Sequence, residues 1–184
     1  RRYNKYLCRR IIIVNQLRMR KYLIIFSLLA AFSLSAQNKV AFTKLVKETS
    51  GIYTLDGSPY TGESLILWPS NNKPMQRVEW KNGKIHGTFQ SWYEDGKQDQ
   101  IVGYKEGVRH GEFKTFYTNG ATEVHCRYND GILDGAYISY YKSGKRQKQV
   151  TFVDGLEQGP FKLYHTNGAV EQEGSYTDGK PDGL

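Results

Sequence analysis

The chain has 184 residues, of which 39% are hydrophobic and 24% charged, a composition typical of a folded rather than a disordered protein. Its 14 Tyr, 8 Phe, 3 Trp and 19 Gly favour short strands and tight turns over a helical bundle. The formal net charge of +8 arises from residues 1–37, because the remainder holds 18 basic and 18 acidic residues. A nucleic-acid partner is therefore not expected, since the folding part lacks the required basic excess.

The first 36 residues are interpreted as sequence that does not enter the fold. Residues 1–18 begin with Arg, and we interpret them as an extension upstream of a start at Met19. Residues 19–36 have a charged start, an apolar run that ends at Leu34 and a small-residue exit, as in a signal peptide. The run is distinctly shorter than the roughly 20 residues that a membrane span needs. We therefore expect export to the periplasm or the medium, with cleavage near Ala36 and no stable membrane span.

Cysteine usage agrees with a fold stabilised by packing alone. Cys126 is the only thiol after Cys8, so the exported chain has no partner for an intramolecular disulfide. No cysteine follows the apolar run where a lipid-attachment signal would need one. We therefore expect a soluble exported protein rather than a lipoprotein.

A period of 24 residues organises the chain from Trp80 onward, without insertions. Three glycine columns recur in each unit: Gly83, Gly107, Gly131 and Gly155; Gly87, Gly111, Gly135 and Gly159; and Gly96, Gly120, Gly144 and Gly168. Two aromatic columns lie between the second and third glycines: Phe89, Phe113, Tyr137 and Phe161; and Trp92, Phe116, Tyr140 and Tyr164. These glycines and the first aromatic column are predicted to be structural.

Each unit is predicted to form one β-hairpin. Asp-Gly or Asn-Gly at the third glycine readily adopts the positive φ angles of a hairpin turn, and a second turn at the first glycine begins the next unit. Period-two alternation places Phe89 and Tyr93 on one face of a strand and Trp92 on the other. Val78 and Trp80 share a face in the same way on the other kind of strand, the one that follows a third-glycine turn. The fold is therefore predicted to be all-β and antiparallel.

The ends of the array differ from its interior. Residues 37–54 are assigned to an N-terminal segment or cap, and residues 55–184 to about five repeats. The first unit is degenerate, as terminal repeats often are, and has Asn72 where the third glycine would stand. The last unit stops partway, at Leu184, so we expect further sequence after it.

The units resemble the MORN-variant repeat, the bacterial relative of membrane occupation and recognition nexus repeats. The resemblance covers about residues 55–184 and rests on W-K-N-G-K-I-H-G-T-F-Q-S-W-Y-E-D-G and its successors. It implies an elongated single-layer antiparallel sheet that acts as a scaffold or binding module. Many bacterial members carry an antitoxin label.

No motif in the repeats predicts catalysis, a cofactor or a metal site. His86 and His110 share one column with Asp134, Gln158 and Asp182, as expected of a polar turn position rather than of metal ligands. The acids that precede the first glycines are expected to cap turns through their side chains: Glu106, Asp130, Asp154 and Asp178. No nucleophile elbow or phosphate-binding loop is recognisable.

The second aromatic column is the candidate binding face. One sheet cannot bury aromatic columns on both of its faces, so Trp92, Phe116, Tyr140 and Tyr164 are predicted to stay exposed and to bind a partner. The reverse assignment of the two columns remains open at this stage. A protein partner is favoured because repeats extend a surface without a catalytic focus. The alternatives are a cell-wall or glycan-binding module, and the repeat part of a longer exported enzyme.

Overall fold

The structure is a computed structural model that describes residues 39–182. The expectations for residues 1–18 and for the signal peptide at 19–36 lie outside the described residues. The described part is a unit of its own and consists almost entirely of strands, with one short 3₁₀ helix, η1 (Phe42–Lys44), near its start. None of the described residues belongs to a helix long and apolar enough to cross a membrane.

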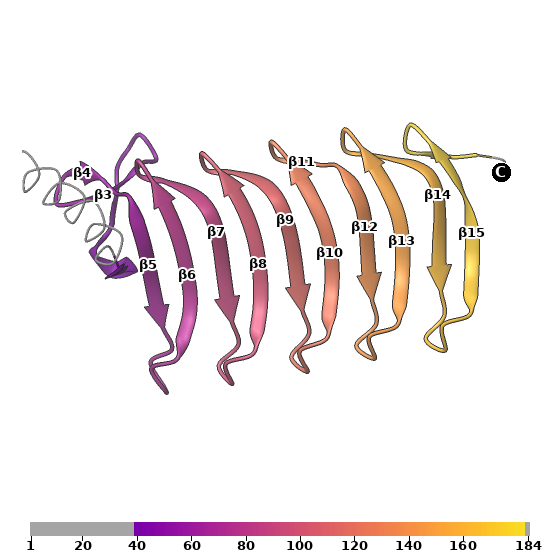
Figure 1. The fold of residues 1–184 in the computed structure, drawn as a ribbon, viewed down its shortest axis with the longest axis horizontal. Helices are drawn as coiled ribbons and strands as arrows, with labels where there is room; N and C mark the ends of the chain where they lie inside the picture. Colours follow the sequence, from indigo (N-terminus) through magenta and orange to yellow (C-terminus); the bar gives the residue numbers. More distant parts are fainter. Residues whose placement is uncertain (1–38, 183–184) are drawn as a thin grey trace, which may run out of the picture. The chain divides into compact units, whose positions relative to one another are not determined.

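A 13-stranded sheet contains most of the chain, and its strands follow one another in chain order (Figure 1). The pairing is antiparallel except that β1 (Lys39–Ala41) runs parallel to β5. The other strands are β5 (Gly62–Leu67), β6 (Pro74–Lys81), β7 (Lys84–Trp92), β8 (Gln98–Lys105), β9 (Val108–Phe116), β10 (Thr122–Asn129), β11 (Ile132–Leu133), β12 (Gly135–Tyr140), β13 (Arg146–Val153), β14 (Leu156–Tyr164), β15 (Val170–Thr177) and β16 (Lys180–Pro181). The predicted all-β class and tandem hairpins are confirmed.

The first residues of the described part form a small cap beside the sheet. A three-stranded sheet contains β2 (Val46–Lys47), β3 (Tyr53–Leu55) and β4 (Ser58–Pro59). Leu45 and Tyr60 from this region are buried in one cluster with Val78 and Trp80 of β6. The degenerate first unit is thus divided, because its opening turn joins β3 to β4 while its later part supplies β5 of the large sheet.

Two kinds of turn connect the strands, and only one matches the expected turn geometry. At the first glycines, both turn residues have positive φ, as at Asp130 (45°) and Gly131 (87°), which defines the tight hairpin turns that follow the strand twist. At the third glycines only the glycine has positive φ, as at Gly96 (94°), and the strand register shifts just before the turn. The prediction of two positive φ angles at that Asp-Gly pair is therefore wrong. Asn72, with φ of 56°, takes the place of the missing glycine.

The second glycine column has a role that its spacing did not reveal. Between the pair Val78 and Phe89 and the pair Trp80 and Ile85, the register shifts by two residues, so β7 carries extra residues at Gly87. Gly87 has φ of 96°, a conformation that favours glycine. The same register shift recurs in the hairpin of β8 and β9. These glycines form irregular, bulged positions within long strands, which bend a sheet locally.

Candidate functional site

One face of the large sheet, here called the valine face, holds the buried row of the array. Val78, Val102, Cys126 and Val150 recur every 24 residues, and their exposed fractions are 5%, 1%, 2% and 1%. Val102 lies opposite Phe89 on one side and Phe113 on the other, so these side chains share a face. The first aromatic column therefore lies beside the valine row on the same face of the sheet.

Aromatic rings on this face contact one another. Phe113 contacts Tyr128 at a centroid distance of 5.6 Å, Tyr137 contacts Phe152 at 5.9 Å, and Phe161 contacts Tyr176 at 4.7 Å. Each pair joins the first strand of one hairpin to its second strand. Aromatic pairs at this distance add to the free energy of area burial, so a single layer can pack its own core.

The second aromatic column, here called the aromatic row, lies on the opposite face. Trp92, Phe116, Tyr140 and Tyr164 are the last residues of β7, β9, β12 and β14. Strand alternation from Phe89 places Trp92 on the face opposite to the valine row. All four side chains are half-buried rather than fully exposed. The structure thus brings the four candidates into one regular row of half-buried rings.

The next residue in each repeat forms a hydrogen-bond series, here called the tyrosine ladder. The Tyr93 hydroxyl donates to the Phe116 carbonyl oxygen (2.5 Å), the Tyr117 hydroxyl to that of Tyr140 (2.7 Å) and the Tyr141 hydroxyl to that of Tyr164 (2.5 Å). Burial raises the pKa of Tyr93, and hydrogen bonding to Asp99 raises it further. Each hydrogen bond links one repeat to the next. Of the two adjacent aromatic residues in a repeat, the second is therefore structural and the first is the candidate binding residue.

The ladder begins and ends with altered residues. In the first unit Trp68 takes the position of the tyrosine, and its indole Nε1 donates to the Trp92 carbonyl oxygen at 3.1 Å. In the last unit His165 replaces the tyrosine, and its Nδ1 lies 3.7 Å from a carboxylate oxygen of Glu171. Sequence reasoning missed the ladder, although the unbroken run of donors in the column was its signal.

The histidine column joins successive turns and brings no metal site together. His86 Nδ1 lies 3.2 Å from the Glu106 carboxylate, and His110 Nδ1 lies 3.2 Å from that of Asp130. Gln158 in the same column accepts a hydrogen bond from the backbone N–H of Asp178 at 2.8 Å. Over residues 39–182, no group of three or more His, Cys, Asp or Glu side chains could hold a metal ion.

The prediction that acidic side chains cap the turns at the first glycines is wrong. Side-chain caps occur at the third glycines, where Asp95 accepts from the backbone N–H of Lys97 (2.9 Å) and Asn167 from that of Ala169 (2.8 Å). At the first glycines the acidic residues occupy the left-handed turn position instead. Within the described chain their side chains make no hydrogen bond to their own turn, because the left-handed backbone already closes it.

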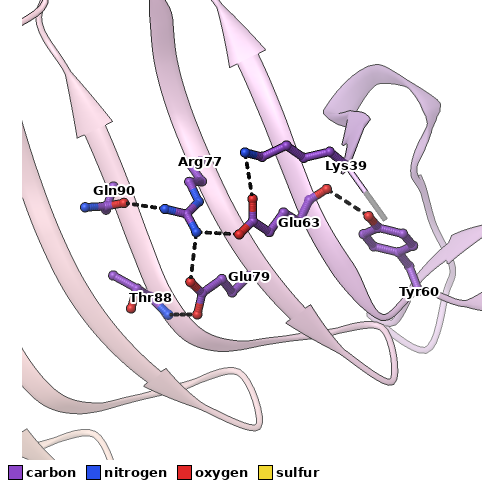
Figure 2. A network of polar contacts seen from close by, with 7 residues as sticks. All are labelled: Lys39, Tyr60, Glu63, Arg77, Glu79, Thr88 and Gln90. Atoms are coloured by element: carbon purple, nitrogen blue, oxygen red, sulfur yellow. Dashed lines mark hydrogen bonds and ion pairs between the residues drawn. The ribbon is translucent and has the colours of Figure 1, made fainter. Parts of the chain in front are cut away.

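Figure 2 shows a network of ion pairs at the start of the sheet. It shares a face with the aromatic row, because Arg77 lies opposite Gln90, which is on the same face of β7 as Trp92. The Glu63 carboxylate forms ion pairs with the Lys39 ammonium group, at 3.2 Å, and with the Arg77 guanidinium group. The same guanidinium group also forms an ion pair with Glu79. The hydrogen bond from Arg77 is the largest influence that lowers the pKa of Glu63. A Glu79 oxygen in turn accepts from the backbone N–H of Thr88 at 2.9 Å. The network joins β5, β6 and β7 and is structural.

Cys126 is part of the core rather than of a reactive site. Burial raises the pKa of its thiol to about 11, so the nucleophilic thiolate is scarce at neutral pH. Its side chain lies in the valine row between Phe113 and Tyr137.

The repeat boundaries coincide with those of a known family. The sequence profile described as "MORN repeat variant" matches residues 85–106, 109–130, 133–154 and 157–178. Each matched segment spans the two strands joined by a third-glycine turn and ends at the turn that starts the next hairpin. No curated protein is significantly similar to the chain. Four consecutive matches on four consecutive hairpins show that the chain belongs to the MORN repeat variant family.

Proposed function

We propose that this protein is an exported, non-catalytic repeat scaffold that binds a protein partner through the aromatic row. The observation that carries the proposal is the row itself: one half-buried aromatic ring in each of four consecutive hairpins, on the face opposite to the valine row. Aromatic side chains supply large contact areas at low conformational cost, which is why they dominate the binding energy of many interfaces.

The backbone around the row supports a binding role because it is fixed independently of the rings. The carbonyl oxygens of Trp92, Phe116 and Tyr140 accept hydrogen bonds from the neighbouring repeat. These bonds use main-chain oxygens, so they do not depend on which side chain the row carries. A surface whose positions are held in advance binds with a smaller entropic loss.

The proposed partner is identified by affinity capture from the envelope fraction of the source cells, followed by titration of the purified candidate. Replacing both Trp92 and Phe116 by Ala should lower the affinity at least about tenfold, as truncation of central aromatic residues does in other interfaces. The matched control replaces Tyr93 and Tyr117 by Phe, which weakens the ladder but leaves the row intact. The strand circular dichroism of both variants should match that of the wild type.

The result separates the proposal from its alternatives. Equal affinity of wild type and the Trp92→Ala, Phe116→Ala variant would reject the aromatic row as the binding surface. Binding to a glycan array, with the same loss in the variant and no protein captured, would reassign the row to glycan recognition. Export is tested on its own by N-terminal sequencing of protein from the periplasm or medium, where the expected first residue is Gln37 or Ala36.

A further inference from the structure

A second exposed row lies at the opposite ends of the hairpins from the aromatic row. Val108, Ile132 and Leu156 hold the same position in three consecutive repeats, directly after the tight turns, and are 45%, 50% and 50% exposed. We call these three side chains the turn ridge. Val153, which is opposite Leu156 in the sheet and 48% exposed, extends it.

The ridge is continuous because each member lies against the glycine of the following turn. A Cβ atom added to Gly131 would lie 3.0 Å from Val108, and one added to Gly155 would lie 3.2 Å from Ile132. This contact covers the inter-repeat hydrogen bonds of the turns, such as that from the Gly131 N–H to the Arg109 carbonyl oxygen (2.8 Å). Each aliphatic side chain contacts the backbone with one side only, and about half of its surface stays exposed to water.

Carboxylates accompany the ridge. Each ridge residue follows an acidic turn residue by two positions, in the pairs Glu106 and Val108, Asp130 and Ile132, and Asp154 and Leu156. In the first tight turn of the array the two positions are Asn82 and Lys84, and in the last one Asp178 is followed by Lys180 in place of an apolar residue. Lys105 lies opposite Val108 in the sheet. Asp154 and Asp178 form no ion pair within residues 39–182, so a partner's cations would not need to displace an existing one.

The spacing of the ridge limits the conformation of a matching ligand. Two strand spacings of about 4.8 Å give about 9.6 Å between ridge residues. A polyproline II helix repeats every three residues, or about 9.3 Å, with every third side chain along one edge. A strand presents one face every 6.7 Å or so, and an α-helix needs seven residues, or about 10.5 Å, to return close to one line. The polyproline II repeat fits best.

We propose that the turn ridge binds an extended, basic protein segment in the polyproline II conformation, with an apolar residue at every third position and Lys or Arg between. The apolar residues contact the ridge, and the cations face the carboxylates of Glu106, Asp130, Asp154 and Asp178. This surface is separate from the aromatic row, so the two proposals succeed or fail independently.

The test uses the full chain and a dye-labelled peptide of four Leu-Pro-Lys triplets, followed by fluorescence anisotropy. Proline holds this peptide in the extended helix and aligns its leucines. Two control peptides isolate the two features. Four Leu-Pro-Glu triplets keep the spacing and reverse the charge, whereas four Leu-Pro-Lys-Gln units keep the four lysines and turn successive leucines to different sides. Both controls should bind at least about tenfold more weakly, and affinity for the first peptide should fall as salt rises.

Four variants of the protein locate the binding. Replacing Val108, Ile132 and Leu156 together by Thr should reduce affinity at least about tenfold, whereas Val170→Thr, at another exposed valine, should not. Asp154→Asn with Asp178→Asn should reduce affinity while leaving the turns intact, because Asn-Gly suits such turns. Unchanged affinity in either the ridge variant or the Asn variant would overturn the proposal, as would equal binding of all three peptides. The Trp92→Ala, Phe116→Ala variant should bind the peptide normally.

Discussion

Loss of a single hydroxyl from the tyrosine ladder should measurably weaken the contact between two repeats. Tyr117→Phe removes the 2.7 Å hydrogen bond to the Tyr140 carbonyl oxygen and leaves the ring in place. A neutral hydrogen bond of this kind contributes about 1 kcal/mol to the free energy of unfolding. For an array of this size, that corresponds to a lowering of Tm by about 3 °C.

The measurement is thermal and urea unfolding followed by circular dichroism at the strand band. A repeat array behaves approximately as a linear series of units coupled to their neighbours. Weakening a central coupling should therefore lower the urea midpoint and also broaden the transition, because the two halves unfold less cooperatively. Tyr140→Phe is the matched control, since within the described residues its hydroxyl forms no hydrogen bond. If both variants unfold alike, the ladder does not couple the repeats and the reasoning is refuted.

Three further predictions concern a close approach between two strands, the thiol and the ion pairs. Gly103→Ala should destabilise the fold by about 2 kcal/mol, because the added Cβ would lie 2.2 Å from a backbone oxygen of the neighbouring strand; a wild-type urea midpoint would contradict this close approach. In a variant that lacks the N-terminal cysteine, Cys126 should react with Ellman's reagent at pH 8 only as fast as the protein unfolds, and immediate labelling would show that the thiol is accessible. Because Arg77 lowers the pKa of Glu63 in the fold, this carboxylate contributes stability above its unfolded pKa and loses it as pH falls through the folded one. Tm should thus fall more between pH 6 and pH 3 in the wild type than in Glu63→Gln, and parallel pH profiles would exclude the linkage.

The hairpin architecture could be predicted from the sequence because the period and the alternation are both local. Glycine positions every 24 residues determine where the turns lie, and the alternation about Phe89 determines which side chains share its face. Neither inference needs knowledge of contacts between distant residues. The same alternation predicts that Phe89 and Trp92 lie on opposite faces of their strand.

The details that the sequence left open depend on contacts between repeats. The hydroxyl of Tyr93 reaches a carbonyl 23 residues away, and no pattern within one unit indicates the direction of that bond. The two types of turn also look alike in sequence, since Asp-Gly and Asn-Gly occur at both. Only the strand register distinguishes them, because a shift before Gly96 removes the need for a second left-handed residue. The degree of exposure of the aromatic row was also not evident from the sequence, because its four side chains are half-buried rather than fully exposed.

Each hairpin is hydrogen-bonded only to the hairpins next to it, so the number of hairpins in the array can change. Every tight turn from Gly107 onward repeats the same hydrogen bond, from a glycine N–H to a carbonyl oxygen 22 residues earlier. The boundaries between successive repeats are therefore equivalent. Duplication or deletion of 24 residues would produce a boundary with the same hydrogen bond. Unequal recombination can therefore change the number of repeats during evolution. Each added or removed repeat lengthens or shortens the surface by about 10 Å and leaves the packing of the other repeats unchanged.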